Sequence, residues 1–132
     1  DYLQYDQSNR ALQLDQFFPK SLINVPATHT QKIIVSAFKG DTWLAYQTDN
    51  QKLTQLILKK GKFLIINGNE IKLVLGNSNA SKVLHNKKLL EVSSRTGIKS
   101  LIFPYSSHKK FKLPLFYKNK NNEYVPSQET GQ

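Results

Sequence analysis

Short apolar runs, repeated at close intervals, are the feature of this sequence that most constrains its fold. Between residues 32 and 103 eight such runs occur, none longer than eight residues, and Gly, Asn, Asp or Ser separates each run from the next. Segments this short predict β-strands and leave no room for helices between them. We therefore predict an all-β chain, a single antiparallel β-sandwich of about seven to nine short strands that is Ig-like in general architecture. The runs are 32–38 (KIIVSAF), 42–48 (TWLAYQT), 52–59 (KLTQLILK), 62–67 (KFLIIN), 70–75 (EIKLVL), 80–85 (ASKVLH), 87–92 (KKLLEV) and 98–103 (IKSLIF).

The breaks between the runs contain residues that favour chain reversal. Asn67-Gly68 predicts the two positive-φ positions of a type I′ hairpin turn. Gly40-Asp41, Asp49-Asn50 and Gly76-Asn77 are expected at three other reversals. Residues 59–62, Lys-Lys-Gly-Lys, predict a tight turn whose lysine side chains lie in water.

The two ends of the chain differ in composition from the region of the runs. Residues 1–31 are rich in Gln and Asn, which predicts a linker or N-terminal extension. Its apolar side chains are expected to let it lie against the domain; they are Phe17, Phe18, Leu22 and Ile23. Residues 32–103 are the predicted β-sandwich domain. Residues 104–132 are expected to be a C-terminal extension, with one edge strand in 110–118 (KFKLPLFYK) because of Pro114, and about eight disordered residues at the end.

The chain starts at Asp1 and contains no methionine, so we expect it to be part of a longer polypeptide or to have been processed from one. Its 132 residues suffice for one domain with its own core. No apolar run approaches the roughly 18 residues needed to cross a bilayer, so a membrane anchor would have to lie in other parts of that polypeptide. The absence of cysteine excludes disulfides and zinc–thiolate sites.

The formal net charge of +10 raises the question of an anionic partner. Seventeen of the 19 basic residues are lysine, whereas base readout and bidentate phosphate contacts favour arginine. The charge therefore favours a solvated surface over nucleic-acid recognition, and nucleic acid is not the expected partner of this domain. The candidate basic interaction patch comprises Lys59, Lys60 and Lys62 with Lys87 and Lys88, and a second cluster comprises Lys109, Lys110 and Lys112.

Trp43 is the only tryptophan and lies in the run 42–48. Strand alternation places Trp43 and Ala45 on one face and Leu44 and Tyr46 on the other, so both faces begin apolar. Tryptophan buries a large area, whereas a stacking groove interleaves several aromatic residues with basic ones. We therefore expect Trp43 to be a core aromatic residue rather than a ligand platform.

Four motifs follow one another at characteristic intervals. A strand leads to a lone tryptophan and a polar Asp turn (IIVSAFKGDTWLAYQTDNQKL), and a second strand ends in a lysine–glycine turn (LILKKGKFLII). A Leu-Gly-Asn turn follows (IKLVLGNSNASKVLHNKKLL), and then a last strand (IKSLIF). Together they resemble the extracytoplasmic C-terminal β-domain of RodZ-type bacterial cell-shape proteins. The chain departs from that pattern at Asp49-Asn50, where such domains usually have Asp-Gly, and at Asn86-Lys87, where they have Asn-Gly; Lys87 adopts such a turn at some energetic cost.

The resemblance implies a longer protein with a cytoplasmic helix-turn-helix domain that meets the actin-like cytoskeleton, one membrane-spanning helix and this domain on the periplasmic side of the inner membrane. Residues 1–31 would then be the end of a linker. The implied function is a non-catalytic interaction domain that helps maintain cell shape by coupling the cytoskeleton to cell-wall elongation. Its expected partners are proteins of the elongation machinery, and an anionic membrane surface is a further candidate.

No motif in the sequence points to catalysis. P-loop, Rossmann, zincin and nucleophile-elbow patterns do not occur, and His29, His85 and His108 are far apart, so we expect no enzyme activity, no cofactor and no metal site. Two other functions remain open. Tyr105, Phe111, Phe116 and Tyr117 stand among lysines, as in a domain that binds single-stranded nucleic acid. A module that binds cell-wall glycan would require Trp43 to be exposed.

Overall fold

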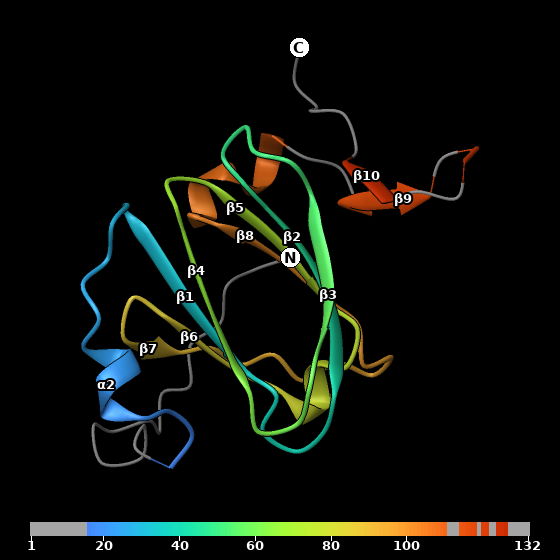
Figure 1. Cartoon of the computed structure of the whole chain (residues 1–132). Helices are drawn as coiled ribbons and strands as arrows, with labels where there is room; N and C mark the ends of the chain where they lie inside the picture. Colours follow the sequence, from blue (N-terminus) through green and yellow to red (C-terminus); the bar gives the residue numbers. More distant parts are fainter. Residues whose placement is uncertain (1–15, 111–113, 119, 122–123, 127–132) are drawn as a thin grey trace.

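The chain folds into two four-stranded antiparallel sheets that pack face to face (Figure 1). The computed structural model describes residues 16–110, 114–118, 120–121 and 124–126. One sheet has the order β4-β1-β6-β7 and the other β3-β2-β5-β8. All eight predicted runs contain a strand, which confirms the β-sandwich. The strands are β1 (Gln31–Ser36), β2 (Thr42–Thr48), β3 (Thr54–Leu58), β4 (Phe63–Gly68), β5 (Ile71–Leu75), β6 (Lys82–His85), β7 (Lys88–Leu89) and β8 (Lys99–Phe103).

Most connections between successive strands cross from one sheet to the other. Among these eight strands only β2–β3 and β6–β7 are neighbours both in sequence and in a sheet. The other connections cross at the two ends of the sandwich, so loops from distant parts of the sequence meet there. The core lies between the sheets and is formed by the inward-facing side chains of both, among them Ile33, Leu44, Leu73, Val83 and Phe103.

The predicted turns are correct in part. Gly61 has φ 85°, and the Lys62 N–H donates to the Lys59 carbonyl at 2.9 Å, which confirms the tight turn. The prediction for Asn67-Gly68 is wrong, because these are the last two residues of β4 and Gly68 packs closely beside Thr48 and Ile71. The chain passes to the other sheet at 69–70, so no hairpin forms there. Asn86 and Lys87, with φ values of 47° and 71°, form the β6–β7 turn.

The segment that precedes β1 covers the outer face of the β4-β1-β6-β7 sheet. Phe18 is buried against Ile34, Leu84 and Leu89. Phe17, Leu22 and Ile23 pack on the same cluster, as the sequence predicts, and the last two belong to the short helix α2 (Lys20–Ile23). The described part of the predicted linker is therefore bound to the sandwich.

Lys32 of β1 holds this N-terminal segment by hydrogen bonds. Its ammonium group donates to the Leu22 carbonyl at 2.8 Å, to the Ile23 carbonyl at 3.1 Å, and also to the Val25 carbonyl. Burial first, and the charge of Lys87 second, lower the pKa of Lys32. A buried ammonium group has three N–H donors to satisfy, and the carbonyls of Leu22 and Ile23 in α2 and of Val25 beyond it provide three acceptors.

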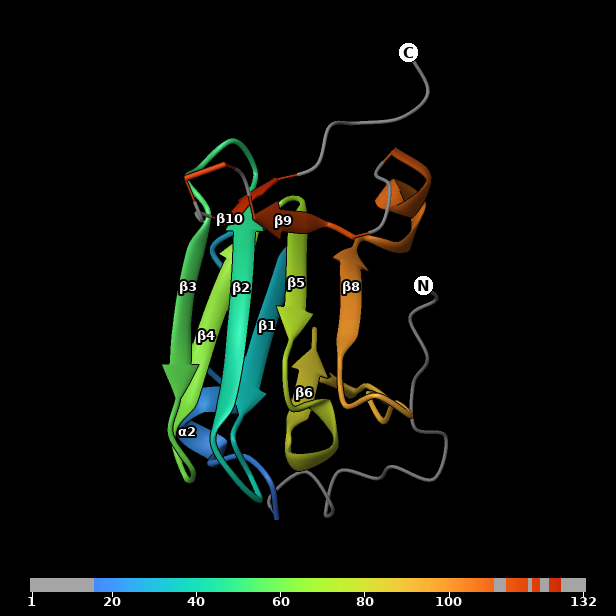
Figure 2. The same cartoon turned by 90° about the vertical axis from the view of Figure 1, so that its right-hand side faces the viewer.

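The segment after β8 covers part of the outer face of the other sheet (Figure 2). It contains a 3₁₀ helix, η2 (Tyr105–Lys110), and the strands β9 (Phe116–Lys118) and β10 (Tyr124–Pro126), which form a separate two-stranded sheet. Leu115 and Phe116 are buried against Ala45 and Ile102. The predicted strand in 110–118 is thus shorter than expected and pairs with β10, which includes Val125 and Pro126 from the predicted tail. Residues 127–132 lie outside the described residues.

Candidate interaction surface

Trp43 packs in an apolar cluster that lies outside the core between the two sheets. It is half-buried on the outer face of its sheet and packs against a small cluster with Ala45 and Phe116. Leu44, its neighbour, faces the core instead. Both faces of β2 are apolar because the C-terminal segment covers the outer one. A glycan-binding module would need an exposed tryptophan, whereas Trp43 is half-buried.

The predicted basic patch is divided between two places. Lys59, Lys60 and Lys62 lie in the β3–β4 turn, beside the Ser36 end of β1, because Phe63 pairs with Ser36. Lys87 and Lys88 lie at the β6–β7 turn, where Asn86 bonds to Lys32. Four residues of extended chain, roughly 13 Å, separate the two places along β1. Lys109 and Lys110 belong to η2 with side chains outside the described set, and Lys112 lies outside the described residues.

The first of these places belongs to a larger surface, here called the basic end. It consists of four segments, residues 37–41, 59–62, 77–82 and 91–99, which connect strands at the lower end of the sandwich in Figure 1. The segments contain seven basic and two acidic residues, a formal excess of five positive charges. The basic residues are Lys39, Lys59, Lys60, Lys62, Lys82, Arg95 and Lys99. Sequence reasoning missed four of them because they are far apart along the chain.

Backbone hydrogen bonds join the four segments into one structure. Ala37 donates to the Lys62 carbonyl at 3.1 Å and accepts from Gly61 at 2.8 Å. Lys39 donates to the Ala80 carbonyl at 2.9 Å, and Ser78 donates to the Gly97 carbonyl at 2.7 Å. Loops that hold each other in this way present their side chains in a defined arrangement.

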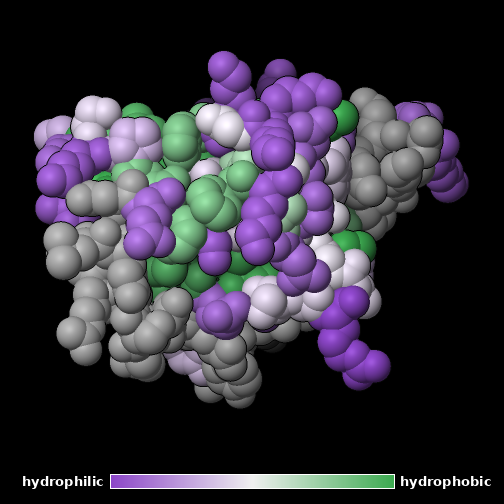
Figure 3. Space-filling view, turned by 90° about the horizontal axis from the view of Figure 1, so that it is seen from below, coloured by the Kyte–Doolittle hydropathy of each residue, from purple (hydrophilic) through white to green (hydrophobic). Residues whose placement is uncertain are grey.

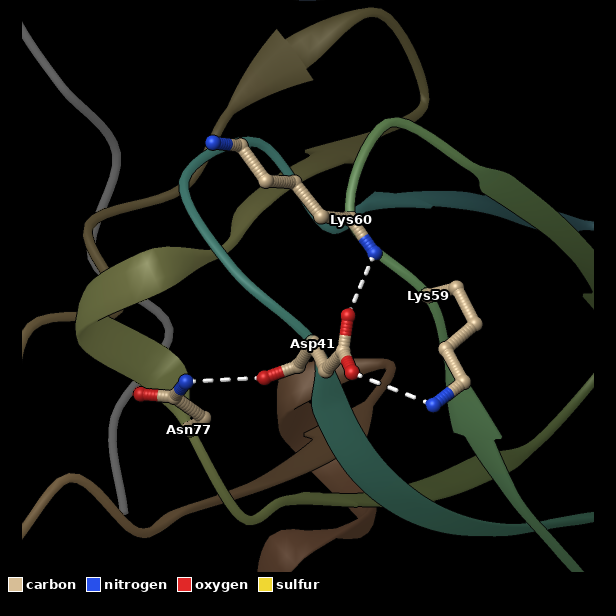
Figure 4. A network of polar contacts seen from close by, with 4 residues as sticks. All are labelled: Asp41, Lys59, Lys60 and Asn77. Atoms are coloured by element: carbon tan, nitrogen blue, oxygen red, sulfur yellow. Dashed lines mark hydrogen bonds and ion pairs between the residues drawn. The ribbon is translucent and has the colours of Figure 1, made fainter.

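Asp41 is the central polar group of the basic end (Figure 4). One carboxylate oxygen accepts from the Lys60 backbone N–H at 2.8 Å, and the other pairs with the Lys59 ammonium at 3.2 Å. The Asp41 carbonyl accepts from the Asn77 side-chain amide at 2.8 Å. The bond from Lys60 first, and that from Lys59 second, lower the pKa of Asp41. The carboxylate therefore holds the lysine turn in place while neutralising one of its charges.

Apolar side chains lie among these cations. Phe38 and Ile98 are 37% and 56% exposed, so two large apolar side chains reach the surface here. Phe38 meets the half-buried Phe17 edge to face at 5.0 Å, and the Lys82 ammonium stands 4.6 Å from the centre of the Phe17 ring. Seen from below, apolar surface lies between hydrophilic side chains on this side of the molecule (Figure 3).

Among the described residues, most cations of the basic end make no ion pair. Within the described residues, Lys59 is the one lysine of this surface that makes an ion pair. Lys39, Lys60, Lys62 and Arg95 are exposed. Two of the four described acidic residues, Asp49 and Glu70, lie at the other end of the sandwich, where the Asp49 carboxylate accepts the Glu70 N–H at 2.9 Å. The positive field of the basic end is thus weakly compensated.

A pocket of about 270 Å³ lies next to the N-terminal segment, lined by Asn24, Val25, Pro26, Ala27, Thr30, Lys32, Asn86 and Lys87. The ammonium of Lys32 is occupied by the three carbonyls already described. It therefore holds the N-terminal segment rather than facing a ligand. The rest of the wall is largely apolar and contains no acid–base pair.

His85 is the histidine of greatest chemical interest. It is buried between the sheets, where its Nε2 lies 2.6 Å from Gln31 Oε1 and its ring lies 4.6 Å from that of Phe103. Burial first, and the charge of Lys88 second, lower the pKa of His85 to about 4. His29 is exposed and bonds to Thr28, and the side chain of His108 is not described. Among the described residues no three His, Asp or Glu side chains are grouped as a metal site would require.

Of the four aromatic residues that favour nucleic-acid binding, the two whose side chains are described, Phe116 and Tyr105, do not form a shared exposed platform. Phe116 is buried, with the Lys72 ammonium 6.0 Å from its ring centre. Tyr105 is 45% exposed, at the other end of the sandwich from the basic end. Phe111 lies outside the described residues, and the side chain of Tyr117 is not described.

No family model matches the chain, and searches of curated proteins and of solved structures find no match. No helix in the described parts of the chain is long and apolar enough to cross a membrane. The basis for a function is therefore the geometry of the sandwich together with the order of its motifs.

Proposed function

We propose that this chain is a non-catalytic interaction domain on the periplasmic side of a bacterial inner membrane. It would belong to a longer, membrane-anchored protein of the RodZ type, which maintains cell shape by coupling the cytoskeleton to cell-wall elongation. It would need no cofactor, and its partners would be proteins of the elongation machinery.

One observation supports this proposal above others: the motifs that carry the resemblance touch one another. Gly76 of the Leu-Gly-Asn turn donates to the Trp43 carbonyl at 2.7 Å. Asn77 of the same turn bonds to Asp41, and Asp41 bonds to the lysine–glycine turn. Motifs that are distant in sequence therefore build a single structure at the basic end, which gives their fixed order a physical reason.

The sandwich leaves edges and ends for partner proteins, because the flanking segments pack on the outer faces of both sheets. The clearest edge is β3, which within the described residues pairs with β2 alone. Its Ile57 is 58% exposed, and its segment 54–58 contains neither proline nor charge to protect the edge. An extended segment of a partner would add to the sheet here by backbone hydrogen bonds.

The experiment that tests the proposal determines the size and compartment of the native polypeptide. An antiserum against these 132 residues is used on fractionated cells, with and without protease outside the inner membrane. The expected result is a larger, membrane-bound protein whose reactive part is removed only by protease outside that membrane. A soluble cytoplasmic protein would overturn the proposal.

A further inference from the structure

We propose that the basic end rests on the anionic head groups of a membrane surface, with Phe38 at the level of the head groups. This inference rests on the proposed function in one respect, since it requires the domain to work beside a membrane. Beyond that function, the inference specifies which surface of the domain binds the lipid and, as a consequence, how the domain is oriented on the membrane.

The composition of the basic end fits an anionic lipid surface. Interfacial binding combines exposed apolar side chains, which enter the head-group region, with lysines that remain among the phosphates. Phe38 and Ile98 provide the apolar side chains, and six lysines with Arg95 provide the charge. Each lysine within about a Debye length of an anionic surface improves binding roughly fivefold.

The course of the chain gives the same orientation. Phe17 lies against Phe38, so the N-terminal segment joins the sandwich at the basic end. In the proposed protein the chain before this segment leads to the membrane anchor. An anchor that precedes this segment would therefore lead into the domain at the basic end.

The same residues make nucleic acid the weaker alternative. Lysine ammonium groups are point charges, whereas base readout and bidentate phosphate contacts favour arginine, of which the surface has one. Stacking on bases requires several aromatic faces along a groove. At the basic end Phe17 is half-buried and meets Phe38 edge to face, so these two rings do not form a row of stacking faces.

The first test places a fluorescent reporter at Phe38. In the 132-residue chain with Trp43→Phe, the substitution Phe38→Trp is expected to shift tryptophan emission to the blue when vesicles are added. The vesicles contain phosphatidylcholine with about one third phosphatidylglycerol. The matched reporter, Tyr105→Trp in the same background, lies at the other end of the sandwich and is expected not to respond.

The second test keeps Trp43 and changes charge. The double variant K60E/K62E is expected to bind these vesicles about a hundredfold more weakly in a sedimentation assay, because two charges near the surface are reversed in sign, which lowers the net charge there by four units. The control, K52E/K87E, changes charge equally but away from the basic end, and its affinity is expected to stay within about threefold of the wild type. Phe38→Ser, an uncharged variant, is expected to weaken binding as well. Thermal unfolding is measured for each variant to establish that it is folded.

Three results would overturn the inference. They are equal binding to pure phosphatidylcholine, equal loss in K60E/K62E and K52E/K87E, and an oligonucleotide that binds more tightly than the vesicles and displaces them. The proposed function is tested separately, by the cell fractionation. If the protein is membrane-anchored and periplasmic but does not bind the vesicles, only the lipid inference is refuted. If it is cytoplasmic and binds them, the proposed function is refuted.

Discussion

Gly76 lies directly against Trp43. The Gly76 N–H donates to the Trp43 carbonyl at 2.7 Å, and a Cβ on Gly76 would stand 3.0 Å from Trp43 Cε3 and 3.1 Å from the Trp43 carbonyl oxygen. The Leu-Gly-Asn turn and the lone tryptophan therefore depend on one another. Any side chain at position 76 would push the tryptophan, or the turn, out of place.

We expect Gly76→Ala to lower the free energy of unfolding by about 1–3 kcal/mol, because the added methyl group overlaps Trp43. Urea denaturation followed by tryptophan fluorescence measures the change. Gly40→Ala is the matched control, since its Cβ would meet nothing closer than 3.7 Å and its φ is not positive. That control is expected to be neutral or to stabilise by about 0.4–1 kcal/mol. Equal changes in the free energy of unfolding for the two substitutions would show that the close contact with Trp43 does not affect stability.

Asp41 is expected to hold the lysine turn in a pH-dependent way. The pKa of Asp41 in the folded state is lowered, so the ionised carboxylate stabilises the fold above the unfolded-state pKa near 3.8. This contribution is lost as the pH falls through the lower folded-state pKa. Hydrogen exchange at the Lys60 amide, which bonds to the carboxylate, reports it directly.

In Asp41→Ala the Lys60 amide is expected to exchange faster than in the wild type, while amides in the β1–β6 ladder keep their protection. Asp41→Asn keeps an acceptor for that amide but loses the charge for Lys59, so it is expected to give an intermediate rate. Unchanged exchange in Asp41→Ala would mean that the turn does not need the carboxylate.

Sequence alone predicted the strands well, because alternation and short runs are local properties. The face of each strand was harder to assign. Trp43 and Leu44 are adjacent and both apolar; Leu44 faces the core, and Trp43 faces the side of the sheet on which the C-terminal segment packs. Because such a contact depends on the tertiary fold, the alternation of apolar and polar residues along β2 does not reveal it.

The misplaced turn and the divided basic patch have related causes. Asn67-Gly68 has the composition of a hairpin turn, but β4 and β5 belong to different sheets, so the chain needed a crossing rather than a hairpin. Lys59 and Lys87 looked like parts of one patch because each lies in a lysine-rich turn. The topology places them at opposite ends of β1 instead. The role of Lys32 could not be predicted either, because it depends on carbonyls that reach it only when the N-terminal segment folds back.

We expect the stability of the domain to fall as the pH is lowered from about 6.5 to about 4. The pKa of His85 is about 4 in the folded state and near 6.5 when the chain is unfolded, so the unfolded state binds more protons in this range. The contribution of the neutral imidazole is fully present above pH 6.5 and is lost towards pH 4. Its size is on the order of 2 kcal/mol after allowance for partial solvation.

His85→Gln tests this pH dependence. Its amide can still donate to the Gln31 oxygen, and it does not titrate. The free energy of unfolding of the variant is expected to vary less between pH 6.5 and pH 4 than that of the wild type. A steep loss that persists in His85→Gln would assign the pH dependence to other groups.

Lys87→Gly is expected to stabilise the β6–β7 turn. Lys87 has φ 71°, a conformation that is strained for a residue with a side chain and free of strain for glycine. The greater freedom of glycine in the unfolded chain offsets part of the gain, which leaves a net increase of about 0.5–1 kcal/mol in the free energy of unfolding. Lys88→Gly, in the adjacent strand β7, is the control and is expected to destabilise, because no positive φ requires glycine there. Urea denaturation of the two variants compares them, and a Lys87→Gly protein less stable than the wild type would show that contacts of the lysine side chain outweigh the strain in its backbone.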